Sequence, residues 1–227
     1  MKLIKNYSLI LSFIISTSFV YSQTNTGSPY SLNEVGEINF LGNVSSISMG
    51  GIDSAIDSIE FNINNPSSLA KLKTTNYLIG TFYKSTGISN SVSTDNINTA
   101  NINYIAIGVP TKRFGFGFGV LPYSSVGFNL QTTEDYNTKN SINSRLFGAE
   151  GNINRAFVSV GVPLLKYFSL GATANYNFGK FNYEKFNLIE NVNYGIFSNS
   201  SSEISGFTYN FSSNLSIPKK WLHAKSS

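Results

Sequence analysis

Alternating large and small residues fill most of the stretch 101–130. Its second half alternates glycine with larger apolar residues, namely Phe114, Phe116, Phe118 and Val120. A period of two is that of a β-strand, and here the large apolar groups share one face. Residues 110–113 predict a turn, because Pro110 fixes its own φ and cannot donate to a strand ladder. The stretch therefore predicts an antiparallel hairpin with one apolar face.

The same unit of strand, proline-led turn, cation and aromatic residue recurs at Pro163 and again at Pro218. Alternation predicts about six strands, at 75–85, 101–110, 113–130, 153–163, 166–182 and 204–217. The polar segments 85–99 and 132–152 are predicted to be long loops. Short turns on one side and long loops on the other are typical of an outer-membrane barrel.

Composition favours a membrane interpretation of this pattern. Only 12% of the residues are charged, against about 25% in typical globular proteins, and the chain has 18 Phe and 13 Tyr. We therefore expect an all-β fold, an antiparallel transmembrane β-barrel over residues 74–227 whose apolar face contacts lipid. Alternation alone also fits a secreted soluble β-protein that buries this face, so that alternative stays open.

Residues 1–22 predict a cleaved signal peptide. Lys2 and Lys5 precede an apolar run that is too short to span a bilayer as a helix. With the barrel, this signal predicts a location in the cell outer membrane. The chain has no cysteine, which excludes disulfides, thiolate metal sites and a lipoprotein anchor. Its net charge of +4 is too small to indicate nucleic acid binding.

A segment without sustained alternation, residues 23–73, precedes the predicted strands. Its Asn-Pro-Ser-Ser-Leu-Ala stretch predicts a turn into one helical turn, with Pro66 at the first helical position. This stretch and the preceding Gly-Gly-Ile-Asp-Ser-Ala resemble, in order and spacing, the N-terminal plug of FadL-type outer-membrane transporters of hydrophobic compounds, as found in Bacteroidetes. The resemblance implies a small helical plug with the motif residues Gly50, Gly51, Asn65, Pro66 and Leu69.

The hairpin carries a second resemblance to the FadL family, because its proline-containing turn is followed by a proline-aromatic break. In that family the break forms a lateral gap through which an apolar ligand leaves the barrel for the bilayer. The resemblance implies a lateral opening and ligand path at Leu121, Pro122, Tyr123 and Gly127. Pro122 lacks a ladder donor, so a local opening is physically reasonable. A bulge without any transport role is the alternative.

The resemblance implies an outer-membrane channel for uptake of hydrophobic compounds such as long-chain fatty acids. A non-transport FadL-like scaffold in protein secretion or surface attachment, similar to PorV, is an alternative. The expected partners are hydrophobic small molecules, outer-membrane lipid and the barrel assembly machinery, and no cofactor is expected. Because about six strands cannot close a barrel, we expect the chain to be a truncated copy, an incomplete part of a larger barrel.

We do not expect an enzyme. The outer-membrane hydrolases and acyltransferases rely on a positioned histidine, and the one histidine here, His223, lies in no strand pattern. Glu134 and Asp135 have neither a partner carboxylate nor metal-ligand spacing, and are predicted to lie in a solvated loop.

Overall fold

The computed structural model describes residues 31, 35–54, 59–89, 94–136, 141–189 and 195–216. Its elements are, in chain order, β1 (Glu37–Ile38), α2 (Val44–Ser48), the 3-10 helix η3 (Pro66–Lys71), β2 (Asn76–Ser89), β3 (Thr94–Pro110), β4 (Gly115–Tyr136), β5 (Ser141–Leu165), β6 (Phe168–Ile189) and β7 (Ile196–Leu215). None of the helices in these ranges is long and apolar enough to cross a membrane. The predicted signal peptide at 1–22, the turn at Pro218 and His223 lie outside the described residues.

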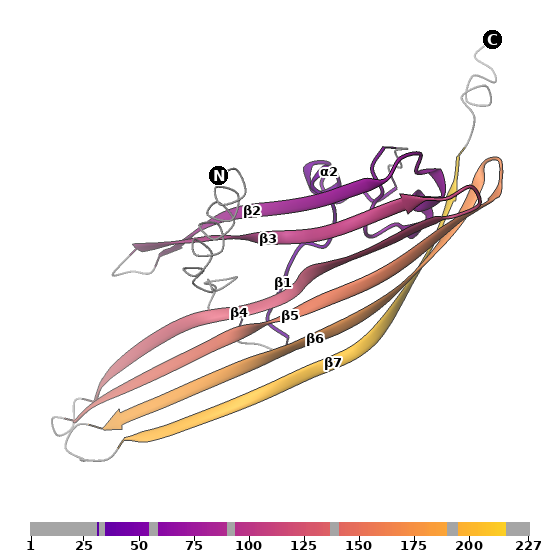
Figure 1. Ribbon diagram of the computed structural model, residues 1–227. Coiled ribbons are helices and arrows are strands. Elements are labelled where there is room, and N and C mark those ends of the chain that lie inside the picture. Colours follow the sequence, from indigo (N-terminus) through magenta and orange to yellow (C-terminus); the bar gives the residue numbers. More distant parts are fainter. Residues whose placement is uncertain are drawn as a thin grey trace, which may run out of the picture.

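A single antiparallel sheet runs in the order β2-β3-β4-β5-β6-β7, and β1 pairs with β4 off this path. Figure 1 shows β4 to β7 as long, twisted, curved strands, from which the β2–β3 hairpin diverges along its length. Strands β2 and β7 are the two edges of the described sheet. The predicted all-β, antiparallel, barrel-type fold is confirmed, and the described strands form an open, curved wall.

The strands are longer than predicted. β5 has 25 residues, whereas a tilted strand needs about 9–11 to cross a bilayer. The predicted loop at 132–152 is wrong, because β4 and β5 stay paired as far as Tyr136 and Ser141. The predicted loop at 85–99 is wrong for the same reason, since β2 and β3 pair as far as Ser89 and Thr94. The sequences of these extensions are mostly polar and lack the sustained apolar alternation that predicts strands, although their backbone groups still pair.

The two faces of the wall differ in what covers them. The large apolar residues of the alternating strands are exposed on the outer face, and Phe211 of β7 is 82% exposed. The small residues on the opposite, inner face pack against residues 61–72. A soluble sandwich would bury the apolar face instead. Exposure of the apolar face and cover over the small face are what a lipid-facing barrel wall requires.

Aromatic side chains mark the limits of this exposed apolar band. At one limit the rings of Tyr176 and Phe178 stack at 5.7 Å, and Tyr176 lies 4.9 Å from the ring of Phe207. At the other limit Phe114 is exposed beside the β3–β4 turn. Along β6 the band extends from Phe168 to Phe178, about the length of a tilted strand that crosses a bilayer. The band thus has the height and the aromatic borders of a membrane-facing surface.

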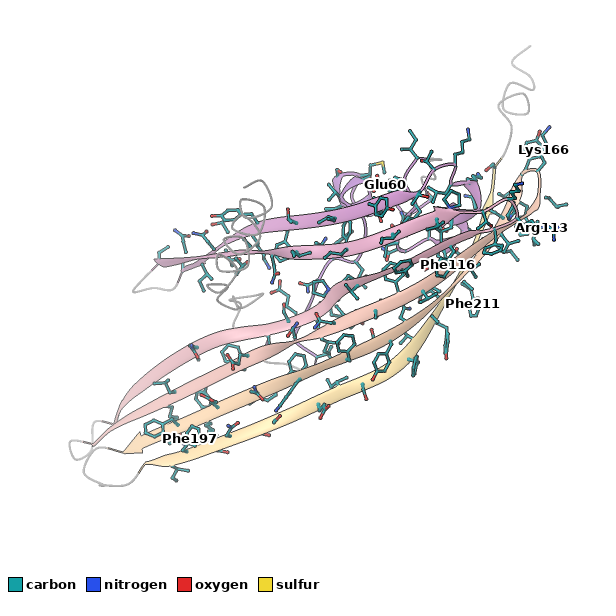
Figure 2. All side chains as sticks on the ribbon, in the orientation of Figure 1. Glu60, Arg113, Phe116, Lys166, Phe197 and Phe211 are labelled. Atoms are coloured by element: carbon teal, nitrogen blue, oxygen red, sulfur yellow. The ribbon has the colours of Figure 1, made fainter. Side chains whose placement is uncertain are left out.

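The two ends of the wall are unlike. Figure 2 shows Arg113 and Lys166 together at one end, where the short turns lie, and Phe197 at the opposite end. We call these the turn end and the loop end. The apolar band begins at the turn end, and the polar strand extensions lie between the band and the loop end.

Candidate functional site

The first candidate site is the contact between η3 and the inner face of the wall, and it depends on glycines. A Cβ atom at Gly115 would lie 2.0 Å from the carbonyl oxygen of Leu69, and one at Gly171 would lie 2.2 Å from the amide nitrogen of Ser67. Both distances are far below van der Waals contact. Pro66 and Leu69 are fully buried in this contact. Three strands, β4, β5 and β6, thus use small residues to admit the helix, and we call residues 59–72 the plug.

Hydrogen bonds attach the plug to the last described strand. The N–H of Ser67 donates to Ser212 Oγ at 2.8 Å, and Lys71 Nζ donates to Asn214 Oδ1 at 3.1 Å and also to Ser216 Oγ. Ser212 and Asn214 belong to β7. The plug therefore joins β7 to the strands that precede it.

A partly buried cluster of hydrogen-bonded polar side chains fixes the conformation of the segment before η3. The Asp53 carboxylate accepts hydrogen bonds from Ser46 Oγ at 2.7 Å, Asn62 Nδ2 at 3.0 Å and Asn64 Nδ2 at 3.1 Å. Asn65 Nδ2 donates to the Asp53 backbone carbonyl at 2.9 Å. One carboxylate therefore ties the end of α2 to the Asn-rich entry of η3.

Replacing Asp53 by Asn is expected to loosen this segment. An amide offers a single acceptor oxygen to three donors, and the loss of charge-assisted hydrogen bonds costs about 1–2 kcal/mol. Limited proteolysis of the plug checks this expectation, with Ser54→Ala as the control because Ser54 is exposed. Equal cleavage rates in the two variants would contradict the role given to Asp53.

The residues of the predicted plug motif lie at two different sites in the structure, one after α2 and the other at η3. Pro66 takes the first position of η3, as predicted, and Asn65 precedes it at the N-cap, where its side chain makes no capping hydrogen bond. Gly50 and Gly51 instead end α2 with φ angles of 74° and 86°, and the N–H of Gly51 donates to the Ser46 carbonyl at 2.8 Å. The Gly-Gly pair therefore ends a helix in the left-handed region, where glycine is favoured, and stands apart from the η3 contact.

The second candidate site is a gap in the wall between β3 and β4. The two strands pair only from Pro110 and Gly115 to Ile105 and Val120, whereas β4 pairs with β5 from one end of β4 to the other. A cleft of about 1520 Å³ lies where β3 and β4 separate. At the same level the β4 register shifts between Pro122 and Ser124, so Pro122 lies at a β-bulge. We call this cleft the β3–β4 gap.

Of the four residues predicted to form a lateral opening, Leu121 and Pro122 line the gap, whereas Tyr123 and Gly127 do not. Leu121 is buried in the inner core with Phe157, and the Tyr123 ring lies 4.2 Å from the Arg155 guanidinium. The N–H of Gly127 is buried and donates to Ser31 Oγ at 3.5 Å. That these residues form a lateral opening in the wall stays a prediction. The lining combines apolar side chains, among them Ile105, Val120 and Phe178, with several polar ones, among them Asn101, Glu150, Asn152, Asn154, Lys180 and Asn182.

Strand β1, which sequence reasoning missed, lies beside β4 at the gap. Glu37 pairs with Ser125 and Ile38 with Ser124, and the N–H of Asn39 donates to the Tyr123 carbonyl at 2.9 Å. Two residues are too few for alternation to be visible, so no sequence signal could have located this strand. Among the described residues, no group of three His, Asp or Glu side chains is arranged to hold a metal ion.

An antiparallel wall with an exposed apolar band, aromatic borders and a packed inner plug defines the class of outer-membrane barrel-type proteins. The chain belongs to the BamG family, whose family model matches residues 3–223. This family is linked to the barrel assembly machinery, and membership indicates an outer-membrane-associated protein. Searches among curated proteins and among solved structures give no match.

The family match corrects the resemblance to FadL-type transporters and, with it, the predicted uptake of hydrophobic compounds. The motifs behind that resemblance have physical causes that are not specific to transport. Gly50 and Gly51 end a short helix, while Asn65 and Pro66 begin the helix that packs against wall glycines. Any barrel-type wall that contains a small plug places similar demands on its sequence.

Proposed function

We propose that this chain is a non-enzymatic outer-membrane component that associates with the barrel assembly machinery and supports the assembly of other outer-membrane proteins. The family match supports both the partner and the process. The exposed apolar band is the single structural observation that carries the membrane location, because such a surface is unstable in water unless lipid or protein covers it.

In this proposal the chain is exported with removal of residues 1–22, and lipid covers the apolar band. The turn end faces the periplasm and the loop end faces outward, because short turns are periplasmic in outer-membrane barrels. The plug then lies on the periplasmic side of the wall. The polar extensions of β4 to β7 project from the opposite side of the membrane, where they can contact other proteins.

Purification of a tagged full-length protein from outer membranes of its own cells tests this function. We expect extraction to require detergent, and we expect subunits of the barrel assembly machinery to co-purify in stable proportion. Depletion of the protein should reduce the folded, heat-modifiable fraction of other outer-membrane barrels. Normal barrel assembly after depletion, together with no co-purifying machinery subunit, would refute the proposal.

A further inference from the structure

We propose that the β3–β4 gap is a binding site for an extended segment of another outer-membrane polypeptide, and that β1 occupies this site when the partner is absent. The inference rests on the proposed function and specifies how the chain would contact a partner. Three observations carry it: two strand edges face the gap, a short strand of the chain itself already pairs there, and two buried hydroxyls beneath that strand make no hydrogen bond within the described part of the chain.

The two strands that border the gap leave backbone groups available for pairing. Beyond Ile105 and Val120 the paired residues of β3 belong to β2, and those of β4 belong to β5 and β1. In the described part of the chain, the facing sides of β3 and β4 are thus sheet edges over most of their length. Such edges pair readily with an added strand, whose main chain supplies most of the binding contacts.

Strand β1 shows that the β4 edge accepts a strand. Besides its pairing with Ser124 and Ser125, its Glu37 carboxylate forms an ion pair with Lys84 of β2 at 2.5 Å. Strand β1 thus bridges the gap, because its backbone pairs with β4 and its Glu37 side chain contacts the β2–β3 hairpin. Both groups of the ion pair are partly exposed, so this contact holds β1 only weakly.

The fit of β1 against β4 is incomplete. The hydroxyl groups of Ser124 and Ser125 are fully buried but make no hydrogen bond with the described residues. Buried hydroxyls without partners are unfavourable, and a ladder of two residues offers few bonds in return. Both features favour exchange of β1 for a longer strand that could also supply a hydrogen-bonding side chain.

The position and lining of the gap favour a polypeptide over a lipid chain. Val120 pairs with Ala156, which pairs with Tyr176, so the gap opens at the aromatic border of the apolar band. From there it extends toward the loop end, beside Glu150 and Lys180. An acyl chain would leave these polar groups unpaired, whereas an extended segment with polar side chains and free backbone groups satisfies them.

Engineered cysteines offer a clean test, because the chain has none of its own. The pair Glu37→Cys and Ser125→Cys would tether β1 in the gap on oxidation, since the two residues are partners in the ladder. The pair Val158→Cys and Ala174→Cys, partners on the outer face of β5 and β6, is the matched control tether. Gly36→Val should release β1, because a Cβ there would lie 2.6 Å from the Ser125 carbonyl oxygen at a φ of 80°.

The probe is a fluorescein-labelled peptide with the sequence of residues 196–205, the polar end of a barrel strand, added to full-length protein in detergent micelles. The same peptide with alternate backbone N-methyl groups is the control, because it keeps the side chains but cannot form a ladder. We expect the released variant to bind the probe about 10-fold more tightly than the wild type, since β1 no longer competes. The oxidised β1 tether should weaken binding by about 10-fold or more, and reduction should restore it.

Equal binding by the oxidised and reduced β1 tether would overturn the proposal, as would binding of the N-methylated peptide or no binding by any form. Comparison of peptide binding by the oxidised and the reduced β1 tether tests the proposal even if the Gly36→Val variant fails to fold. The control tether should leave binding unchanged. Co-purification with the machinery does not depend on this result, so loss of peptide binding with intact co-purification would refute the strand site alone.

Discussion

Replacement of Gly171 by Ala is expected to displace η3 from the wall. The added Cβ would lie 2.2 Å from the Ser67 amide nitrogen and 2.3 Å from the Pro66 carbonyl carbon. Both are backbone atoms of a buried helix, so no side-chain rotation can relieve the overlap. We expect a loss of about 3 kcal/mol in the free energy of unfolding, at the upper end of the range for an overpacked core. Chemical denaturation in detergent measures this loss.

Hydrogen exchange should show the loss locally. The amides of the plug, above all the Ser67 N–H that bonds to Ser212, should exchange faster in the variant. Gly206→Ala is the matched control, because a Cβ at that position of β7 meets nothing within 4 Å. Alanine there should be neutral or slightly stabilising, since glycine weakens a strand interior by roughly 0.5–1 kcal/mol. Equal exchange rates in the two variants would show that the plug does not depend on the wall glycines.

The part of the fold that could be predicted is the part in which the two faces of a strand meet different surroundings. Phe116 and Phe118 alternate with Gly115 and Gly117 because one side faces outward and the other admits the plug. That contrast is visible as a period of two in the sequence. Pro66 was recognisable for a local reason, since its fixed φ suits the start of a helix.

What could not be predicted depends on contacts between distant residues or on backbone pairing alone. Asp53 is an unremarkable acid in the sequence, and only the fold brings Asn62 and Asn64 to its oxygens. The extension of β4 to Tyr136 has the polar sequence Gln-Thr-Thr-Glu-Asp-Tyr, which lacks the alternation of a strand and therefore predicts a loop. Backbone pairing with β5 makes this extension a strand, although its side-chain pattern does not predict one.

The predicted break at Pro122 shows what a single residue can and cannot predict about the surrounding structure. A proline in the middle of a strand correctly marked a place where pairing changes, since a bulge and the β3–β4 gap both lie there. Pro122 alone could not predict which segment occupies the gap. The occupant depends on β1, more than eighty residues earlier in the chain, and on polar side chains contributed by β5 and β6.

Replacement of Phe211 by Arg is expected to impair membrane insertion, because its side chain points outward near the middle of the apolar band. Phe211 lies on β7 between the aromatic border at Phe207 and the turn end, and Figure 2 shows it projecting away from the wall. An arginine on the lipid face near the bilayer midplane costs about 2–4 kcal/mol, and less near the borders. Folding into lipid vesicles, followed by heat-modifiable migration, measures the inserted fraction.

The neighbouring residue supplies the control that separates a membrane wall from a soluble sheet. Asn210 is also exposed, but it lies on the inner face, opposite Thr173 of β6. Asn210→Arg should therefore insert normally, and Phe211→Leu should do so because it keeps an apolar side chain. On a soluble sheet both arginines would be surface substitutions of similar, small effect. Equal tolerance of the two arginines would mean that lipid does not cover the apolar band, and protein contacts would then have to cover it instead.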